Sequence, residues 1–286
     1  MTILILGGRG KTATRLSALL QDAQIPFIVG TSSPISIGIY PSAHFNWLDR
    51  ETWEAVFNRT DSPISAIYLV GAHAPEFIPP MLEFIDEAYS RGVKRFVLLS
   101  ASTTKKGDAM MGEAHAYLDA FEDIRYVVLR PTWFMENHIE DPHLSWIKAD
   151  NRIYSATGAG KIPFVSADDI ARVAFVALTE SHLFPQKEHE YMVLGPELLS
   201  YAKMAESLGD VLGRKITHVS LSEDEFARVL VEKAGLPADF ARMLAMMEGA
   251  VAEGSEERLS DDVERLTGRP PVRFVDFARE KRECWM

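Results

Sequence analysis

Short apolar runs alternate with helical patterns along the first half of the chain. The apolar runs predict buried strands at Ile3–Leu6, Pro26–Val29, Ala43–Phe45, Ala66–Val70, Arg95–Leu99 and Tyr126–Leu129. Between them, apolar side chains recur at the three- and four-residue spacing of amphipathic helices. These helices are expected at Thr12–Ala23, Arg50–Phe57, Pro79–Arg91 and Gly112–Ala120. Continuous apolar strands separated by helices are typical of a parallel sheet covered on both faces. The pattern therefore predicts an α/β fold with a doubly wound parallel sheet.

The pattern changes after Pro131, where helices become more frequent than strands. Helices are expected at Glu140–Lys148, Ala167–Thr179, Ser200–Leu212 and through much of Glu223–Ala252. Two further strands are expected at Tyr191–Leu194 and Ile216–Val219, and the charged stretch Glu253–Asp262 is expected at the surface. We therefore predict a core over residues 1–135, to which residues 162–195 return. Residues 136–161 and 196–286 would form a smaller, mostly helical, substrate-binding part.

The junction between the first strand and the first helix is rich in glycine. It contains Gly7, Gly8, Arg9, Gly10, Lys11, Thr12 and Ala13. Glycines at such a turn let the backbone bend sharply and approach a pyrophosphate, and the following helix N-terminus attracts anions. This arrangement predicts a Rossmann-like dinucleotide site, with an ordinary tight turn as the alternative. The turn ends in Gly-Lys-Thr, as a nucleoside triphosphatase loop does. The upstream glycine of that loop is missing at the required spacing, so a nucleoside triphosphatase is not expected.

The end of the second strand indicates which dinucleotide is bound. An NAD-specific site usually places a carboxylate there to bind the ribose 2′-hydroxyl. This chain instead has three hydroxyl residues, Thr31, Ser32 and Ser33. These hydroxyls, with Arg9 and Lys11 nearby, suit a 2′-phosphate. NADP(H) is therefore the expected cofactor, and the alternative interpretation of the hydroxyls is a polar turn.

Composition restricts the possible partners. The 286 residues carry a formal net charge of −11, and 47% are hydrophobic. An acidic globular protein of this kind is not expected to bind nucleic acid. The single cysteine, Cys284, excludes an internal disulfide framework and a cysteine-based metal site, and no metal is expected. We also expect a cytoplasmic protein without membrane association, because the chain shows neither a basic leader nor a long apolar stretch. The oligomeric state cannot be deduced from the sequence.

Several longer segments resemble the NmrA-like, atypical branch of the short-chain dehydrogenase/reductase superfamily. They are Gly7–Ala13, Arg95–Ser100, Tyr126–Asn137, Ile162–Ala171, Tyr191–Ser200 and Gly213–Thr217. Within that branch, the run Leu129–Asn137 and the phrases His44–Leu48 and Trp146–Lys148 resemble the fungal festuclavine and agroclavine dehydrogenases of ergot alkaloid biosynthesis. The resemblance implies an NADPH-dependent reductase of secondary metabolism. Its substrate would be a cyclic iminium formed from chanoclavine-I aldehyde, and its product a tetracyclic clavine.

Further cofactor contacts are expected along the carboxyl edge of the sheet. The loop containing Gly71 and His73 follows a strand and would pass beside the adenine ribose and pyrophosphate. The resemblance to related reductases places Ser100, Pro131 and Thr132 near the nicotinamide. For His73, a loop histidine without a role is an equal alternative.

The usual acid catalyst of short-chain dehydrogenases is missing. Those enzymes pair a serine with a Tyr-x-x-x-Lys helix, and here Tyr117 is followed four residues later by Phe121. The remaining catalytic candidates are Ser100, Glu113 and Tyr117, none of which is obligatory. Reduction of an iminium cation gives a neutral amine directly, so no general acid is required. The missing pair is therefore compatible with hydride transfer to a carbon–nitrogen bond.

An aromatic run follows the last strand of the first half. Trp133, Phe134, Met135 and Trp146 could form the walls for a flat cationic substrate, because aromatic faces attract cations. Glu136 or Glu113 could stabilise its positive charge. The alternative is that the aromatic run packs in the core and Glu136 caps a helix or lies on the surface. Two rival functions remain: a non-catalytic NADP(H)-sensing regulator, and an NADPH reductase of another aromatic substrate.

Overall fold

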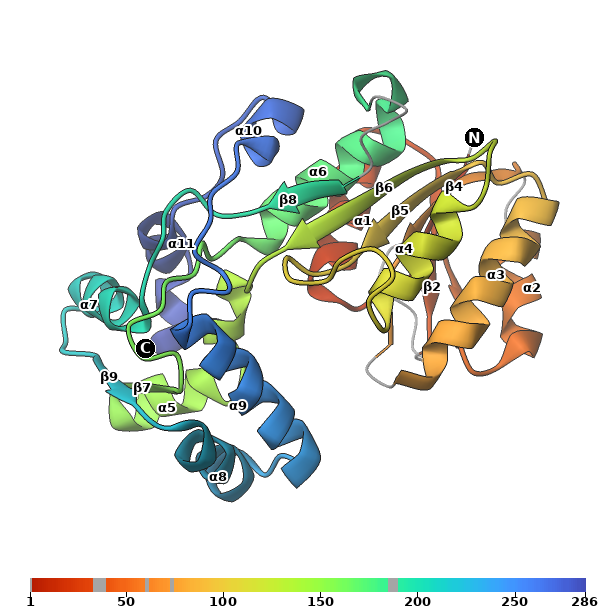
Figure 1. The fold of residues 1–286 in the computed structure, drawn as a ribbon. Coiled ribbons are helices and arrows are strands. Elements are labelled where there is room, and N and C mark those ends of the chain that lie inside the picture. Colours follow the sequence, from red (N-terminus) through yellow and green to blue (C-terminus); the bar gives the residue numbers. More distant parts are fainter. Residues whose placement is uncertain (1, 33–39, 60–61, 73–74, 185–189) are drawn as a thin grey trace. The chain divides into compact units, whose positions relative to one another are not determined.

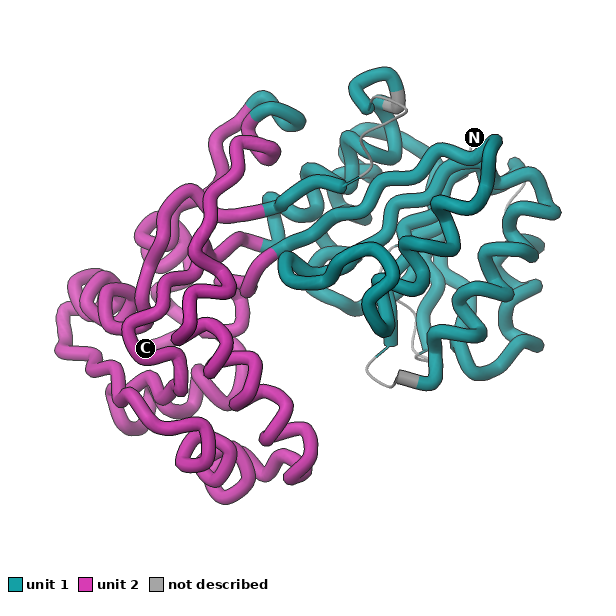
Figure 2. Tube along the Cα trace, in the orientation of Figure 1, with its two compact units in different colours: residues 1–131, 167–193, 265–268 teal, residues 132–166, 194–264, 269–286 magenta. Residues whose placement is uncertain are grey.

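The computed structural model describes residues 2–32, 40–59, 62–72, 75–184 and 190–286. The chain divides into two compact units (Figure 2). Unit 1 contains residues 1–131, 167–193 and 265–268. Unit 2 contains residues 132–166, 194–264 and 269–286. Each unit is therefore built from three separate stretches of the chain.

Unit 1 is built on a seven-stranded parallel sheet (Figure 1). Its strands are β1 (Thr2–Ile5), β2 (Phe27–Thr31), β3 (Ser42–His44), β4 (Ile64–Leu69), β5 (Arg95–Leu99), β6 (Arg125–Pro131) and β8 (Glu190–Val193). Their order is β3-β2-β1-β4-β5-β6-β8, so the direction of winding reverses between β1 and β4. In doubly wound sheets, ligands bind at the carboxyl ends of the strands at this reversal.

Helices cover both faces of this sheet. One face carries α1 (Lys11–Asp22) and α6 (Ala167–Thr179), which pack against each other. The other face carries α2 (Trp53–Asn58), α3 (Ile78–Ser90) and α4 (Met111–Asp119). The strands are apolar on both faces because both are covered. Short 3-10 helices occur at Arg50–Thr52, Pro75–Phe77 and Ser181–Leu183.

Unit 2 contains a small parallel pair of strands among helices. The strands are β7 (Arg152–Ser155) and β9 (Thr217–Ser220). The helices are α5 (His143–Asp150), α7 (Tyr201–Leu212), α8 (Glu223–Ala234), α9 (Ala238–Ala252) and α11 (Phe274–Glu280). Two 3-10 helices lie at Met135–Ile139 and Arg282–Trp285, and α10 (Asp262–Thr267) spans a boundary between the units. One buried cluster joins α7, α11 and Trp285, and another joins α5, α8 and α9.

The predicted doubly wound parallel fold is confirmed, with three local corrections. The strand Arg152–Ser155 was not predicted, because its partner β9 lies far away in the sequence. The helix predicted from Glu140 begins at His143, since a residue that precedes proline disfavours helical geometry and Pro142 follows Asp141. The stretch Glu253–Asp262 is exposed or half-buried as predicted, except at Glu256, whose side chain is buried. No helix in the described ranges is long and apolar enough to span a membrane.

Candidate active site

The glycine turn of unit 1 leaves its backbone open at the carboxyl end of β1. Gly7 has a φ of +72°, which favours glycine, and a Cβ there would lie 3.0 Å from the Val70 side chain. The N–H of Gly10 donates to the carbonyl of Gly7 at 2.7 Å and closes the turn. A Cβ on Gly10 would lie 3.0 Å from that carbonyl. Gly7, Arg9 and Gly10 are exposed, so a ligand can reach the backbone of the turn.

The N-terminus of α1 suits an anionic ligand. Gly10 occupies the N-cap position without a capping side chain, and no acidic residue lies in the first turn. The partial positive charge of the helix is therefore not offset by a carboxylate of its own first turn. Thr12 is buried behind the turn, and its hydroxyl accepts a hydrogen bond from Tyr68 at 3.1 Å. Burial raises the pKa of Tyr68, so this hydroxyl stays protonated as a donor.

The residues expected at the 2′-phosphate end lie beside this turn. The N–H of Gly8 donates to the carbonyl of Gly30 at 3.2 Å, which joins the turn to the end of β2. Thr31 is buried as the last residue of β2, whereas Ser32 is exposed. Lys11 is half-buried at the first position of α1. Ser33 lies outside the described residues.

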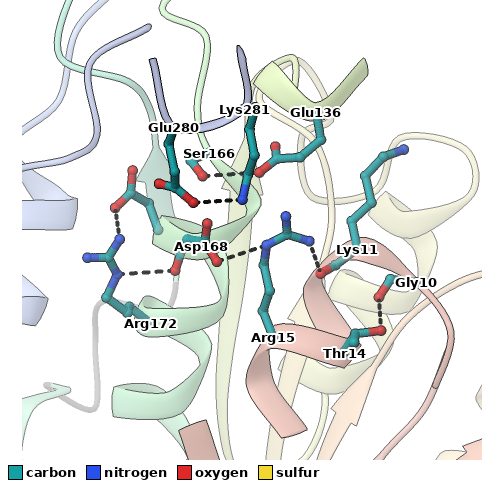
Figure 3. A network of polar contacts seen from close by, with 11 residues as sticks. Gly10, Lys11, Thr14, Arg15, Glu136, Ser166, Asp168, Arg172, Glu280 and Lys281 are labelled. Carbon is teal, nitrogen blue, oxygen red and sulfur yellow. Dashed lines mark hydrogen bonds and ion pairs between the residues drawn. The ribbon is translucent and has the colours of Figure 1, made fainter. Parts of the chain in front are cut away.

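Arg15 lies one turn into α1 and is linked to α6 (Figure 3). Its Nε is 2.8 Å from Oδ1 of Asp168, and its Nη1 donates to the carbonyl of Lys11 at 2.9 Å. Arg15 was not predicted as part of the turn. No local signal marks it, because Asp168 is 153 residues away in the sequence.

The other cofactor positions of unit 1 lie at the carboxyl ends of β4, β5 and β6. Gly71 is half-buried, and a Cβ there would clash with the ring of Phe77 at 2.5 Å. The N–H of Ser100 donates to Leu129 O at 2.8 Å. Pro131 is buried, and its carbonyl accepts from the N–H of Ser102 at 2.8 Å. These positions therefore share one edge of the sheet, while His73 lies outside the described residues.

The two side chains considered as proton donors have other partners. Tyr117 donates to Asp86 of α3, with its hydroxyl 2.7 Å from both carboxylate oxygens. Burial and the neighbouring carboxylate raise the pKa of Tyr117 to about 12. Glu113 is exposed, and its Oε1 accepts from the N–H of Met110 at 3.0 Å, which caps α4. A lysine beside a catalytic tyrosine would lower its pKa, so the surroundings of Tyr117 act in the opposite direction.

The aromatic run of unit 2 divides into half-exposed and buried residues. Trp133 and Phe134 are half-buried, and Met135 is buried in the cluster with α7 and α11. Glu136 is only 1% exposed, and Oε1 of its carboxylate accepts from the hydroxyl of Ser166 at 3.1 Å. This hydrogen bond of Glu136 is therefore made inside unit 2, and not at its surface.

Thr132 and Trp146 also lie inside unit 2. Thr132 is buried, and its hydroxyl donates to Oε2 of Glu256 at 3.3 Å. Trp146 is buried against Tyr154, with the rings nearly perpendicular and their centroids 5.2 Å apart. Trp146 also contacts the ring of His143 edge-on. These contacts make Trp146 part of the packing between α5 and β7.

Three further titratable groups of unit 2 were not predicted: the buried His138 and Glu248, and the half-buried His143. Burial lowers the pKa of His138 to about 4 and that of His143 to about 3. Glu248 of α9 is 2% exposed, and burial raises its pKa to about 8. Oε2 of Glu248 accepts a short hydrogen bond of 2.5 Å from the N–H of Ala156. Helical spacing alone could not distinguish Glu248 from a solvated glutamate.

Comparison with known proteins extends these findings, although no family model matches the chain. Festuclavine dehydrogenase easG of Aspergillus fumigatus is 59% identical, over 100% of this chain and 99% of that protein. Agroclavine dehydrogenase of Claviceps fusiformis is 46% identical, with the same coverage. A crystal structure of Citrobacter sp. triphenylmethane reductase complexed with NADP(H) has a TM-score of 0.80 at 19% identity, covering 98% of this chain and 99% of that one. The negative transcriptional regulator Nmra in complex with NAD has a TM-score of 0.72 at 13% identity, covering 98% and 94%.

The sheet order and the open glycine turn define a doubly wound parallel α/β fold, which the chain shares with the reductase and Nmra structures. Within this class, similarity over the full length shows a narrower relationship. The chain belongs to the family of the festuclavine and agroclavine dehydrogenases, and is therefore an oxidoreductase.

Proposed function

We propose that the protein is an NADPH-dependent reductase that transfers hydride to the carbon of a cyclic iminium. The substrate would arise from chanoclavine-I aldehyde, and the product would be a tetracyclic clavine amine such as festuclavine or agroclavine. The observation that carries this proposal is 59% identity to a festuclavine dehydrogenase over the whole chain. The proposal uses unit 1 for the cofactor and unit 2 for the substrate.

In this proposal the glycine turn and the N-terminus of α1 hold the pyrophosphate of NADPH. The fit rests on the exposed backbone at Gly7 and Gly10, and on a helix N-terminus without a capping side chain. Arg9, with Thr31 and Ser32 at the end of β2, would bind the 2′-phosphate. NADPH, when bound, supplies the hydride. Ser100 and Pro131, at the carboxyl ends of β5 and β6, would orient the nicotinamide.

The chain need not donate a proton during this reduction. Hydride adds two electrons and one hydrogen nucleus to the iminium carbon, and the carbon–nitrogen π electrons become the nitrogen lone pair. The product is a neutral amine, and the cofactor leaves as NADP⁺. The hydrogen bond from Tyr117 to Asp86 and the capping role of Glu113 support this proposal, because neither side chain is set up as an acid.

Within unit 2, Trp133 and Phe134 would contact the flat substrate, since their rings are half-exposed. Aromatic faces attract cations, so the same rings would favour an iminium over a neutral imine. Met135 and Trp146 would support this surface from the core. The buried carboxylate of Glu136 would contribute negative charge to this substrate-binding surface.

The test mixes the protein with NADPH and the iminium derived from chanoclavine-I aldehyde. The absorbance of the reduced nicotinamide should fall as one clavine forms per NADPH consumed. With NADPH deuterated at C4, deuterium should appear at the former iminium carbon. Gly10→Ala is the matched control and should lose activity, because a Cβ there would lie 3.0 Å from the carbonyl of Gly7 and fill space at the turn.

Tight binding of both cofactor forms without oxidation of NADPH would contradict the proposal and favour a redox-sensing regulator. Turnover with a quinone or a dye, but none with the iminium, would instead favour a reductase of another aromatic substrate. A clavine product containing deuterium is expected from neither rival.

A further inference from the structure

We propose that Arg15 and Asp168 are positioning residues for the cofactor pyrophosphate. Their ion pair between α1 and α6 would fix the turn Gly7–Lys11 in the geometry that receives the phosphates. This inference rests on the proposed binding of NADPH. It adds a residue of α6, far from the glycine motif in sequence, to the machinery that binds the cofactor.

The guanidinium of Arg15 makes contacts in two directions (Figure 3). Its Nη1 donates to the carbonyl of Lys11, one turn back toward the N-terminus of α1, at 2.9 Å. Its Nε donates to Oδ1 of Asp168 at 2.8 Å. Arg15 therefore ties the first residue of α1 to the first turn of α6. A planar guanidinium suits this role because its N–H groups have fixed directions.

The turn of α6 that contains Asp168 is held by further contacts. Arg172 donates from Nε to the carbonyl of Asp168 at 3.3 Å. Nη2 of Arg172 lies 3.1 Å from Oδ1 of Asp169, whose side chain is buried. The Asp168 carboxylate is thus presented to Arg15 from a helix turn that has its own ion pair. α1 and α6 also pack against each other along the sheet.

The turn is rich in glycine, so an anchor outside it reduces the freedom of its backbone. The N–H of Gly10 donates to Gly7 O, the N–H of Gly8 donates to Gly30 O, and the N–H and hydroxyl of Thr14 donate to Gly10 O. These bonds tie the turn to β2 and α1, and the Arg15–Asp168 pair adds a link to α6. Glycine backbone loses more conformational freedom on ordering than any other residue. A turn that is already ordered binds its ligand at a lower entropic cost.

Asp168 makes the decisive test because two physical effects have opposite signs there. Its carboxylate adds negative charge near a site for an anion, so Coulomb's law alone predicts tighter NADP⁺ binding once that charge is removed. Positioning predicts the reverse, because Asp168→Asn weakens the anchor of Arg15. The sign of the change in affinity therefore separates the two effects.

The experiment measures dissociation constants by titration calorimetry for NADP⁺ and for 2′-AMP. The second probe carries the adenosine 2′-phosphate but has no pyrophosphate. Asp168→Asn and Arg15→Lys should each weaken NADP⁺ binding about threefold to tenfold, as expected for a partly exposed charged pair. They should weaken 2′-AMP binding less, because of its proposed contacts only Arg9 belongs to the turn. Arg91→Gln is the matched control, because Arg91 makes a similar ion pair with Glu87 in unit 1, away from the turn. It should change neither constant.

Unchanged or tighter NADP⁺ binding in Asp168→Asn would overturn the inference, as would an equal loss for both probes. Thermal unfolding of the cofactor-free variants should show intact folding, and retained 2′-AMP binding is a second check. If the wild-type protein itself binds no NADP⁺, the proposed function fails, and that result is distinct from failure of the positioning role.

Discussion

The hydroxyl of Tyr117 on α4 donates to the carboxylate of Asp86 on α3, 2.7 Å from each of its oxygens. The pair joins two neighbouring helices on one face of the sheet. Tyr117 lies on the helix that the sequence predicts to correspond to the catalytic helix of short-chain dehydrogenases. Its partner is an acid and not a lysine, so the pKa of Tyr117 is raised to about 12.

We therefore expect Tyr117→Phe to retain most of its reductase activity. The variant loses one partly exposed hydrogen bond, which should cost about 0.5–1.5 kcal/mol of stability. In the wild type, the pH profile of turnover should show no ionisation of Tyr117 between pH 6 and 9, since the pKa of Tyr117 is about 12. Steady-state kinetics with the iminium and a thermal melt measure both effects. Glu113→Gln should likewise remain active. Loss of nearly all turnover in Tyr117→Phe, with NADPH binding intact, would contradict reduction without a side-chain acid.

A second prediction concerns the buried hydrogen bond between Ser166 and Glu136 in unit 2. Glu136→Gln should raise KM for the iminium severalfold and change kcat less. Hydride transfer cancels the substrate charge, so a carboxylate stabilises the bound cation more than the transition state. Ser166→Ala should act in the same direction by removing the donor that orients Glu136. The KM for NADPH is the internal control and should not change. A lower kcat at constant KM would argue for a direct role in the chemical step.

The buried His138 and the half-buried His143 should make the protein less stable in acid. The folded pKa values of about 4 for His138 and about 3 for His143 lie below the ordinary value of 6.5. Below pH 6.5 the unfolded chain therefore binds protons that the folded chain does not. Each histidine should lower the unfolding free energy by about 1.4 kcal/mol per pH unit between pH 6 and 4.5. Urea unfolding across this range measures the slope. His143→Phe, which cannot titrate, should reduce it, and an unchanged slope would count against burial of the neutral ring.

Glu248 should act in the opposite direction. Its folded pKa of about 8 lies above its ordinary value of 4.5, so the folded chain binds the extra proton. The stability from this group is complete below pH 4.5 and is lost as pH rises through 8. As pH rises from 5 to 7.5, the unfolding free energy of Glu248→Gln should increase relative to that of the wild type by about 1.4 kcal/mol per pH unit. The glutamine oxygen can still accept from the N–H of Ala156. Parallel stability curves for the two proteins would show that Glu248 is already ionised in the fold.

Trp285 should be one of the most sensitive packing positions of unit 2. Its side chain is fully buried beside Phe277, and its Nε1 donates to the carbonyl of His138 at 2.8 Å. Trp285→Ala should cost about 3–5 kcal/mol of unfolding free energy by leaving a cavity. Trp285→Phe keeps an aromatic ring but loses the donor, and should cost less. Denaturant unfolding measures both, and equal losses would mean that the hydrogen bond dominates.

Secondary structure in unit 1 follows closely from local patterns. The bounds predicted for Arg95–Leu99 and Ala167–Thr179 are those of β5 and α6. Apolar strands and amphipathic helices are recognised from patterns that span only a few residues, so they can be predicted without knowledge of the fold. The strand Arg152–Ser155 was missed because it is short and depends on a partner more than 60 residues later.

The candidate site was less predictable, because its side-chain partners are distant in sequence. The glycine turn is visible as a motif, but the link from Arg15 to Asp168 is not. Tyr117 could be placed on a helix, although nothing local indicated Asp86 as its partner. Burial of Glu248 depends on how α9 meets the backbone at Ala156, and only the folded chain shows that contact.

The division into units has a consequence for protein engineering. The backbone passes from one unit to the other after residues 131, 166, 193, 264 and 268. No single truncation can therefore release either half intact. Grafting unit 2 between relatives would require three segments to be transplanted together: 132–166, 194–264 and 269–286. Recombination at one breakpoint would instead combine mismatched pieces of both cores, so chimeras should be designed around all five junctions.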